Sequence, residues 1–192
     1  MKKGGYPALF ISHRVPIHKR PASVDHRKEP GHWEADLMLF SKYGQALLVA
    51  HERTSRLLIL NQQPNKRSSS VAKHLKELFS KMPQEIRKTI TFDNGTEFAL
   101  HYQLHSLGME TFFCDTHSPW QKGGIENAIG RMRRGLPRKT DLGTLSESAL
   151  INRVIAYNHT PRKCLDFRTP AEVFSQQVLH FKCESTSRIE SG

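Results

Sequence analysis

The sequence predicts an α/β fold in which a mixed five-stranded sheet carries helices on both faces. Residues 32–60 hold three apolar segments with the periodicity of strands, and only short turns separate them, which is typical of an antiparallel meander. Beyond residue 67 the apolar residues recur with a helical period, and helices then alternate with two further strands. The predicted order is therefore βββαβαβα followed by helices. In this order the fourth strand can lie parallel beside the first.

The three consecutive strands are expected at residues 32–40, 46–51 and 57–60. The first begins with alternating polarity and ends in a short apolar run, and residues 41–44 then supply turn-forming serine and glycine. The second contains the longest apolar run of the chain, the five residues 46–50. Strands in series with connections this short pair in antiparallel fashion.

A helix is expected to begin at the serines of residues 68–70 and to end before Pro83. Its apolar residues fall at positions i, i+4, i+7 and i+8 and form one stripe: Val71, Leu75, Leu78 and Phe79. The remaining expected elements are, in order, a strand at 89–92, a helix at 98–107 with Gly108 as its C-cap, a strand at 109–114, a loop at 118–124, and helices at 125–134, 147–158 and 170–177.

Charge is the most informative property of the composition. The chain has 29 Lys and Arg residues against 18 Asp and Glu residues, which gives a net charge of +11 and a pI near 9.8. The excess is local, because residues 1–30 carry seven bases and two acids and residues 122–139 carry six bases and one acid. A local excess favours a surface that binds a polyanion, nucleic acid before membrane, over a protein that is merely basic.

Several classes of protein are disfavoured by the composition. No apolar run exceeds five residues, whereas a membrane-spanning helix needs about 20. The N-terminus has no apolar stretch long enough for a signal peptide, so a cytoplasmic location is expected. The three cysteines, Cys114, Cys164 and Cys183, are too few and too scattered for a disulfide framework or a four-cysteine zinc site.

Three acidic residues stand where the predicted topology would bring them together. Asp36 lies inside the first strand between Ala35 and Leu37, where a buried carboxylate is costly unless something compensates it. Asp93 ends the fourth strand, and Glu126 opens a helix after a glycine-rich loop. If the first and fourth strands are neighbours about 4.8 Å apart, these hard oxygen ligands can share Mg²⁺ or Mn²⁺.

Each acid also has an ordinary interpretation. Asp93, followed by Asn94 and Gly95, is typical of a turn. An acidic residue in the first turn of a helix, such as Glu126, is favoured by the helix dipole. Asp36 within a strand has no such explanation, and it is the combination of the three acids that indicates a metal site.

Three segments around these acids resemble the catalytic blocks of a known family. They are GHWEAD at residues 31–36, TFDNGTEF at 91–98 and SPWQKGGIEN at 118–127. They are similar to the corresponding blocks of DDE transposases, which belong to the retroviral-integrase superfamily with a ribonuclease-H-like fold. YNHTPRKCL at 157–165 and TPAEVF at 169–174 resemble the C-terminal signature of the insertion-sequence-thirty family in that group.

The resemblance runs from about residue 14 to residue 175, with 57 positions from Asp36 to Asp93 and 33 more to Glu126. It implies a ribonuclease-H-like core. Residues 1–30 hold four prolines among bases without a sustained period, so an extended basic arm or linker is expected there. The rest of the chain is expected to form an integrase-type catalytic core with C-terminal helices at 31–175 and a tail at 176–192.

The resemblance also implies a reaction and its partners. Water cleaves a DNA phosphodiester, and the freed 3′-hydroxyl attacks target DNA, so that the outcome is transposition and integration. Two Mg²⁺ or Mn²⁺ ions are implied, with Asp36 shared by both, Asp93 holding one and Glu126 the other. The implied partners are transposon ends and target DNA, with a homo-oligomer as the active complex, no membrane, and a place at the nucleoid in the bacterial cytoplasm.

The DNA contacts are expected from the bases that flank Glu126, which would hold phosphates without reading sequence. An exposed helix face that only meets solvent is the ordinary alternative for any one of them. The expected contacts are Lys122, Arg131, Arg133, Arg134, Arg138 and Lys139, together with Trp120, which could stack on a base.

The sequence departs from the family pattern at a few positions, none of which replaces one of the three acids: Ala35, His159, Asp166 and the pair Gly124–Ile125. Relatives carry N-terminal helix-turn-helix modules that read transposon ends, and this chain is expected to lack them. An alternative therefore stays open, a truncated DNA-binding remnant that does not transpose. A third possibility, a related nuclease acting on RNA–DNA hybrids, is disfavoured by the C-terminal signature.

Overall fold

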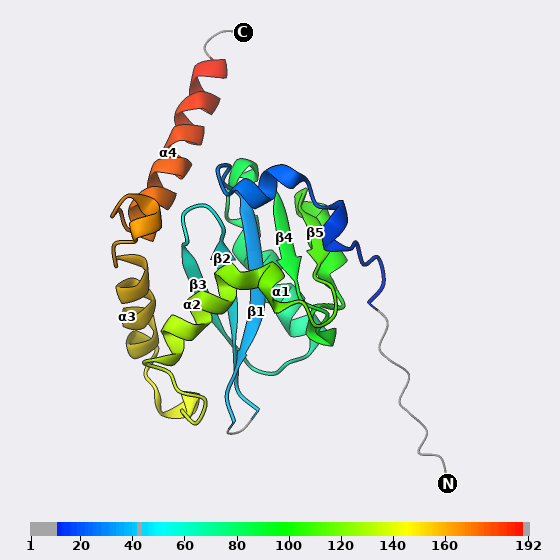
Figure 1. Cartoon of the computed structure of the whole chain (residues 1–192), viewed down its shortest axis with the longest axis vertical. Helices are drawn as coiled ribbons and strands as arrows, with labels where there is room; N and C mark the ends of the chain where they lie inside the picture. The colour runs from blue at the N-terminus through cyan, green and yellow to red at the C-terminus, as the bar shows by residue number, and fades with distance from the viewer. Residues whose placement is uncertain (1–10, 42–43, 190–192) are drawn as a thin grey trace.

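The computed structural model describes residues 11–41 and 44–189 and contains one five-stranded sheet (Figure 1). The strands are β1 (His32–Leu39), β2 (Ala46–Glu52), β3 (Leu58–Gln63), β4 (Thr89–Phe92) and β5 (Glu110–Phe113). Their order in the sheet is β3-β2-β1-β4-β5. The first three pair in antiparallel fashion, whereas β4 lies parallel to both β1 and β5. The predicted mixed sheet, with the fourth strand beside the first, is confirmed.

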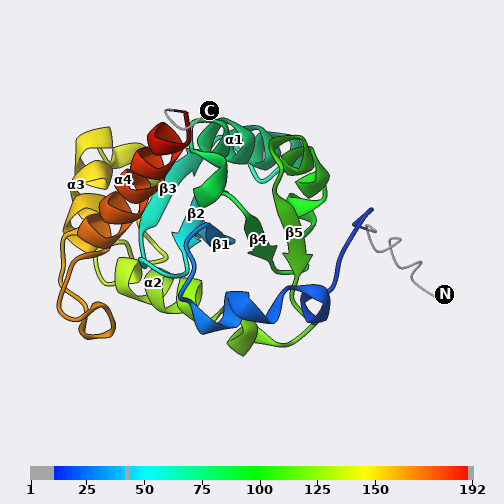
Figure 2. The same ribbon diagram turned by 90° about the horizontal axis from the view of Figure 1, so that it is seen from above.

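The sheet separates two apolar cores, because side chains alternate between its faces. On one face Trp33, Ala35 and Leu37 of β1 pack with α1 (Ser68–Ser80). On the other face Met38 packs with α2 (Gly123–Arg133) and α3 (Glu147–Asn158). Figure 2 shows α1 on one side of the strands and α2 on the other. Alternation along β1 therefore places Glu34 and Asp36 on the α2 face.

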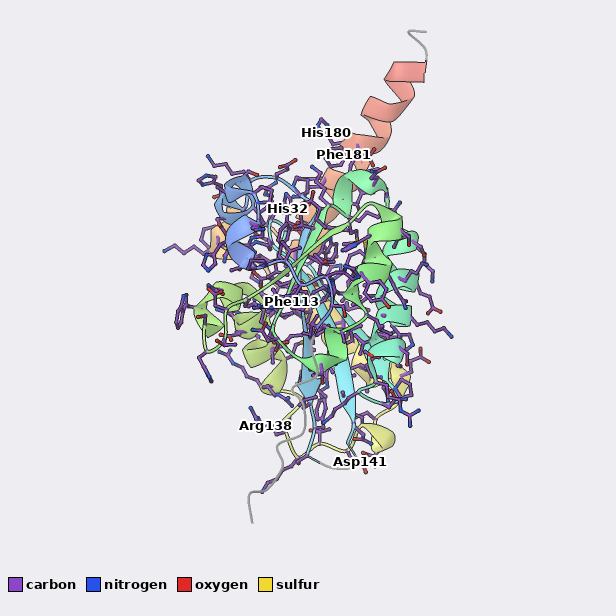
Figure 3. The ribbon with its side chains drawn as sticks, turned by 90° about the vertical axis from the view of Figure 1, so that its right-hand side faces the viewer. His32, Phe113, Arg138, Asp141, His180 and Phe181 are labelled. Carbon is purple, nitrogen blue, oxygen red and sulfur yellow. The ribbon has the colours of Figure 1, made fainter. Side chains whose placement is uncertain are left out.

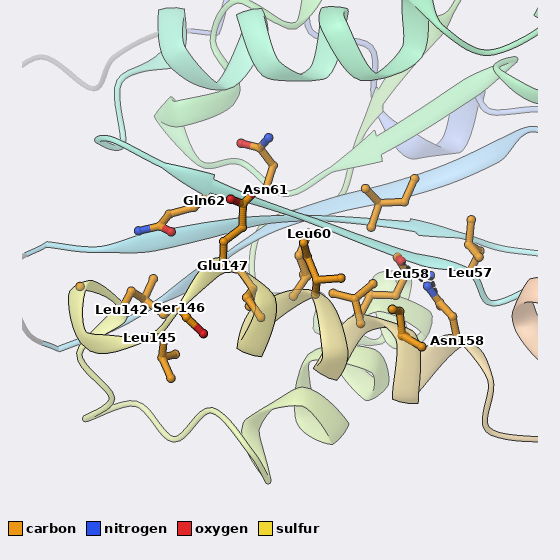
Figure 4. A pocket seen from close by; sticks show the side chains of 16 residues that line it. Leu57, Leu58, Leu60, Asn61, Gln62, Leu142, Leu145, Ser146, Glu147 and Asn158 are labelled. Atoms are coloured by element: carbon orange, nitrogen blue, oxygen red, sulfur yellow. Dashed lines mark hydrogen bonds between the residues drawn. The ribbon is translucent and has the colours of Figure 1, made fainter.

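Asn158, at the end of helix α3, forms hydrogen bonds to the edge strand β3. The side chain of Asn158 accepts a hydrogen bond from the backbone N–H of Leu58 (2.9 Å) and donates one to the carbonyl of the same residue (2.8 Å). A groove with a volume of about 760 Å³ lies between β3 and α3 (Figure 4). None of the three predicted acids lines this groove.

Three expectations about local structure were wrong in detail. The helix expected at 98–107 is made of two 3₁₀ segments, Thr96–Phe98 and His101–Leu107, which Gly108 ends with a φ of +76°. The loop expected at 118–124 contains a 3₁₀ turn, Pro119–Lys122, that leads directly into α2. The last helix, α4 (Pro170–Ile189), continues well past the expected end. Among the described residues no helix, α4 included, is long and apolar enough to cross a membrane.

Residues 11–30 pack against the rest of the protein instead of forming an extended arm. Ile11, Ile17 and Val24 are buried, and Pro16 forms a β-bridge with Phe113 of β5. Two of these side chains belong to short 3₁₀ segments, Ile17 to Ile17–Lys19 and Val24 to Ala22–His26. Scattered prolines suggested a linker, but the segment contributes buried apolar side chains and hydrogen-bonds to β5, where Val15 accepts from the N–H of Phe113. Residues 1–10 of the expected arm lie outside the described residues.

Candidate active site

Asp36 and Asp93 lie close together where β4 ends. The parallel register of β1 and β4 runs as far as the pair Glu34 and Thr91; Asp36 lies two residues further along β1, and Asp93 directly follows β4. A lysine lies between the two acids. The Nζ atom of Lys122 is 2.8 Å from Oδ2 of Asp36 and 3.4 Å from Oδ2 of Asp93.

The Lys122 ammonium is held in place by its charge partners. Only 5% of its side chain is exposed, and burial alone would lower the pKa of Lys122. Asp36 and Asp93 outweigh that effect and raise the pKa, so the ammonium stays charged. Burial conversely raises the pKa of Asp36, although Lys122 opposes the shift. The site thus combines a cluster of carboxylates with one buried positive charge, the ammonium group of Lys122.

Glu126 completes the set from the neighbouring helix. It lies in the first turn of α2, is exposed, and lines the same cavity of about 400 Å³ as Asp36 and Asp93. Lys122 precedes Glu126 by four residues, a spacing that sets two residues on the same side of a helical turn. The three acids predicted from three separate motifs therefore open into one cavity.

Asp93 is oriented by the turn that follows β4. Its Oδ1 atom accepts a hydrogen bond from the backbone N–H of Gly95 (2.9 Å). The side chain of Asn94 donates to the carbonyl of Cys114 at the end of β5 (2.8 Å), which fixes the turn to the sheet. Glu97 adds a fourth carboxylate close by. Burial, Asp93 and Asp36 together raise the pKa of Glu97.

Glu34 anchors the helix that carries Glu126, and sequence reasoning did not assign it a role. Its side chain is fully buried, forms an ion pair with Arg53, and accepts a hydrogen bond from the backbone N–H of Ile125 (2.7 Å). A Cβ atom at Gly124 would lie 2.8 Å from Oε2 of Glu34, so glycine permits this close approach. The signal in the sequence was its alternation with Asp36, which sets both acids on the α2 face.

The predicted metal ligands fit a divalent cation in their chemistry. All are carboxylates, the donors that Mg²⁺ and Mn²⁺ prefer. Within residues 11–41 and 44–189, however, no three His, Cys, Asp or Glu side chains are grouped closely enough to hold one ion. The Lys122 ammonium lies between Asp36 and Asp93 and supplies positive charge at that point. The two aspartate carboxylates therefore favour a positively charged group at this position.

The predicted DNA contacts divide into three kinds. Trp120 is 73% exposed, and four of the bases are also exposed: Arg131, Arg134, Arg138 and Lys139. Arg133 lies over the ring of Phe40 (4.8 Å) and donates to the carbonyl of Leu39 (2.6 Å), so its guanidinium is engaged. Lys122 is buried among the acids. Figure 3 shows Arg138 at the end of the molecule opposite His180 and Phe181 of α4.

Comparison with known proteins identifies relatives of this arrangement. Residues 26–119 match a family described as the integrase core domain. The chain is 36% identical over 178 residues to the transposase InsI for insertion sequence element IS30A of Escherichia coli (strain K12). It is 37% identical over 171 residues to the transposase for insertion sequence element IS1086 of Cupriavidus metallidurans. These alignments cover 92% and 88% of this chain.

The same fold occurs in a solved viral structure. The catalytic core domain of BIV integrase superposes with a TM-score of 0.61 at 22% sequence identity, covering 79% of this chain and 97% of that one. The predicted ribonuclease-H-like architecture is thereby confirmed. This chain spans about half the length of the curated relatives, 46% of InsI and 50% of the IS1086 transposase.

Proposed function

This chain carries an integrase core domain related to those of insertion-sequence transposases, and on that premise we propose that it is the catalytic core of a DDE transposase. The proposed reaction is cleavage of a DNA phosphodiester followed by strand transfer to target DNA. The observation that carries the proposal is that Asp36, Asp93 and Glu126 line one cavity. The buried ammonium group of Lys122 lies between the two aspartates.

The proposed catalytic residues are these three acids, and together they would hold divalent metal. When bound, Mg²⁺ or Mn²⁺ would activate the attacking oxygen and neutralise the charge on the leaving oxygen. Asp36 would act from β1 and Asp93 from the turn that follows β4, whereas Glu126 would act from a helix that Glu34 anchors. Lys122 balances part of the charge of Asp36 and Asp93 at the place where these acids would hold a divalent cation.

The proposed partners are the ends of a mobile element and its target DNA, held by an oligomer of this chain at the bacterial nucleoid. The exposed bases after Glu126 support a DNA surface there: Arg131, Arg134, Arg138 and Lys139. Trp120, exposed in the 3₁₀ turn that leads into α2, offers a ring on which a base can stack. Residues 31–175 are proposed to form this catalytic unit, with the flanking segments outside it.

The test of the proposed function is a cleavage assay with the purified chain and labelled duplex DNA. We expect nicked or strand-transfer products in Mg²⁺ or Mn²⁺ and none in excess chelator. Cleavage that persists fully in chelator would point to another mechanism. Binding without cleavage of any duplex, insertion-sequence ends included, would instead favour the DNA-binding remnant.

DNA binding by this chain is expected to be mainly electrostatic. Neutralising the exposed pair Arg134 and Arg138 to glutamine should weaken binding to all sequences about equally and reduce the slope of log affinity against log salt by about 2. Competition binding at two salt concentrations, with an inverted-repeat duplex against a scrambled one, measures both effects. A preference of ~100-fold or more for the repeat would contradict this expectation.

A further inference from the structure

A second cavity, of about 280 Å³, lies against the first turn of α2 and is lined by arginines. Gly123, Gly124 and Asn127 of α2 form one wall. Asn127 is the neighbour of Glu126, so the same helical turn borders this cavity and the cavity of the acids. The arginines come from four separate parts of the chain: Arg27, Arg56, Arg131 and Arg162.

Within the described part of the chain, the arginines that line this cavity form no direct ion pairs. Nearby Arg20 and Arg53 form ion pairs with Asp25 or Glu34. Among the described residues, by contrast, none of the four lining arginines has a carboxylate within ion-pair distance. Burial lowers the pKa of Arg27, and Arg56 and Arg53 lower it further by repulsion. Like charges gathered at a cavity without counter-charge favour an anion there.

Two buried polar atoms at the cavity have no hydrogen-bond partner. They are Nδ1 of His51 and Nε of Arg56. His51 is only 2% exposed, and burial together with Arg56, Arg27, Arg53 and Arg162 lowers its pKa to about 3. The imidazole is therefore neutral at pH 7 and can donate a hydrogen bond. Buried polar groups are rarely left unpaired, and a ligand or an ordered water in the cavity would supply the partner that these two atoms lack.

We propose that this cavity binds a phosphate group of the DNA backbone next to the phosphate that the acids act on. Guanidinium groups match phosphate oxygens in pairs, and the first turn of α2, which forms one wall of the cavity, adds a favourable helix dipole. The volume suits a phosphate better than a large ligand. The choice of DNA as the source of the phosphate rests on the proposed function. Holding the neighbouring phosphate would set the register of the strand in the acidic cavity.

Replacing Arg56 by glutamine tests this proposal. The variant should bind duplex DNA about 10-fold more weakly near 0.1 M salt, with a salt slope lower by about 1. Its melting temperature should stay unchanged or rise, because removing one of several neighbouring positive charges reduces the electrostatic repulsion in the folded protein. The control is Lys76→Gln, which removes an exposed charge from α1 on the opposite face of the sheet. Binding is measured in chelator, so the result does not depend on whether the chain cleaves DNA.

Cys164 provides a second measurement that needs no substitution. It is exposed and lines the cavity, whereas Cys114 is buried and burial raises the pKa of its thiol to about 11. Alkylation of the Cys164 peptide, quantified by mass spectrometry, should slow several-fold with inorganic phosphate relative to chloride at equal ionic strength. Duplex DNA should protect in the same way.

The outcomes separate the sources of the ligand. Protection by phosphate and by DNA, with weaker DNA binding of the Arg56 variant, supports the proposal. Protection by phosphate alone, with normal DNA binding of the variant, would overturn DNA as the source and assign the cavity to a free anion. No protection by either ligand would overturn the site itself, whatever the cleavage assay shows.

Discussion

Replacing Asp93 by asparagine is expected to reduce metal-dependent DNA cleavage by about 10³-fold or more while leaving the fold intact. Asparagine keeps an oxygen that can accept the hydrogen bond from the N–H of Gly95, so the turn after β4 should persist. It removes the charge that attracts a cation and that now pairs with Lys122. The measurement is the single-turnover cleavage rate at saturating Mn²⁺, with the circular dichroism spectrum as the check on folding.

The matched control for this variant is Glu110→Gln. Glu110 is an exposed carboxylate at the start of β5, whereas the acidic cavity lies beyond the other end of that strand. The control removes the same charge from the protein and should retain near-normal cleavage. Equal losses in both variants would indicate a general effect of charge, and full activity of the Asp93 variant would remove Asp93 from the proposed catalytic set.

The arrangement of strands and the adjacency of Asp36 and Asp93 could be predicted because both depend on local patterns. Apolar segments with period 2, separated by short turns, indicated the antiparallel meander of β1, β2 and β3. The helix before β4 indicated that β4 lies parallel to a neighbouring strand. Glu126 could be predicted from its motif and from its place at the start of α2. Its role, like those of the two aspartates, stays a prediction until the variants are assayed.

The supports of the site could not be predicted, because they depend on contacts between distant residues. Nothing near Arg53 in the sequence marks it as the partner of Glu34, 19 positions away. Lys122 looked like a surface base among other bases, and only the folded chain turns its ammonium toward the acids. The packing of residues 11–30 depends on isolated apolar side chains without a period, and such residues carry no local signal.

Replacing Glu34 by leucine is expected to destabilise the protein by about 3–5 kcal/mol, the range for a buried ion pair that loses one partner. Glu34 is fully buried, and Arg53, only 3% exposed, would keep its charge with Asp25 as its remaining acidic partner. The N–H of Ile125 would lose its acceptor as well, which frees the start of α2. Urea unfolding followed by fluorescence measures the loss.

The double variant Glu34→Leu with Arg53→Met separates the two roles of Glu34. Replacing both partners by apolar side chains leaves no unpaired charge and should recover most of the stability. Cleavage should stay reduced, because Ile125 still lacks an acceptor and Glu126 sits one residue further on. Glu29→Gln, which breaks a more exposed pair with Lys88, should cost no more than about 1 kcal/mol. If the double variant recovers cleavage together with stability, Glu34 serves the fold alone and does not position Glu126.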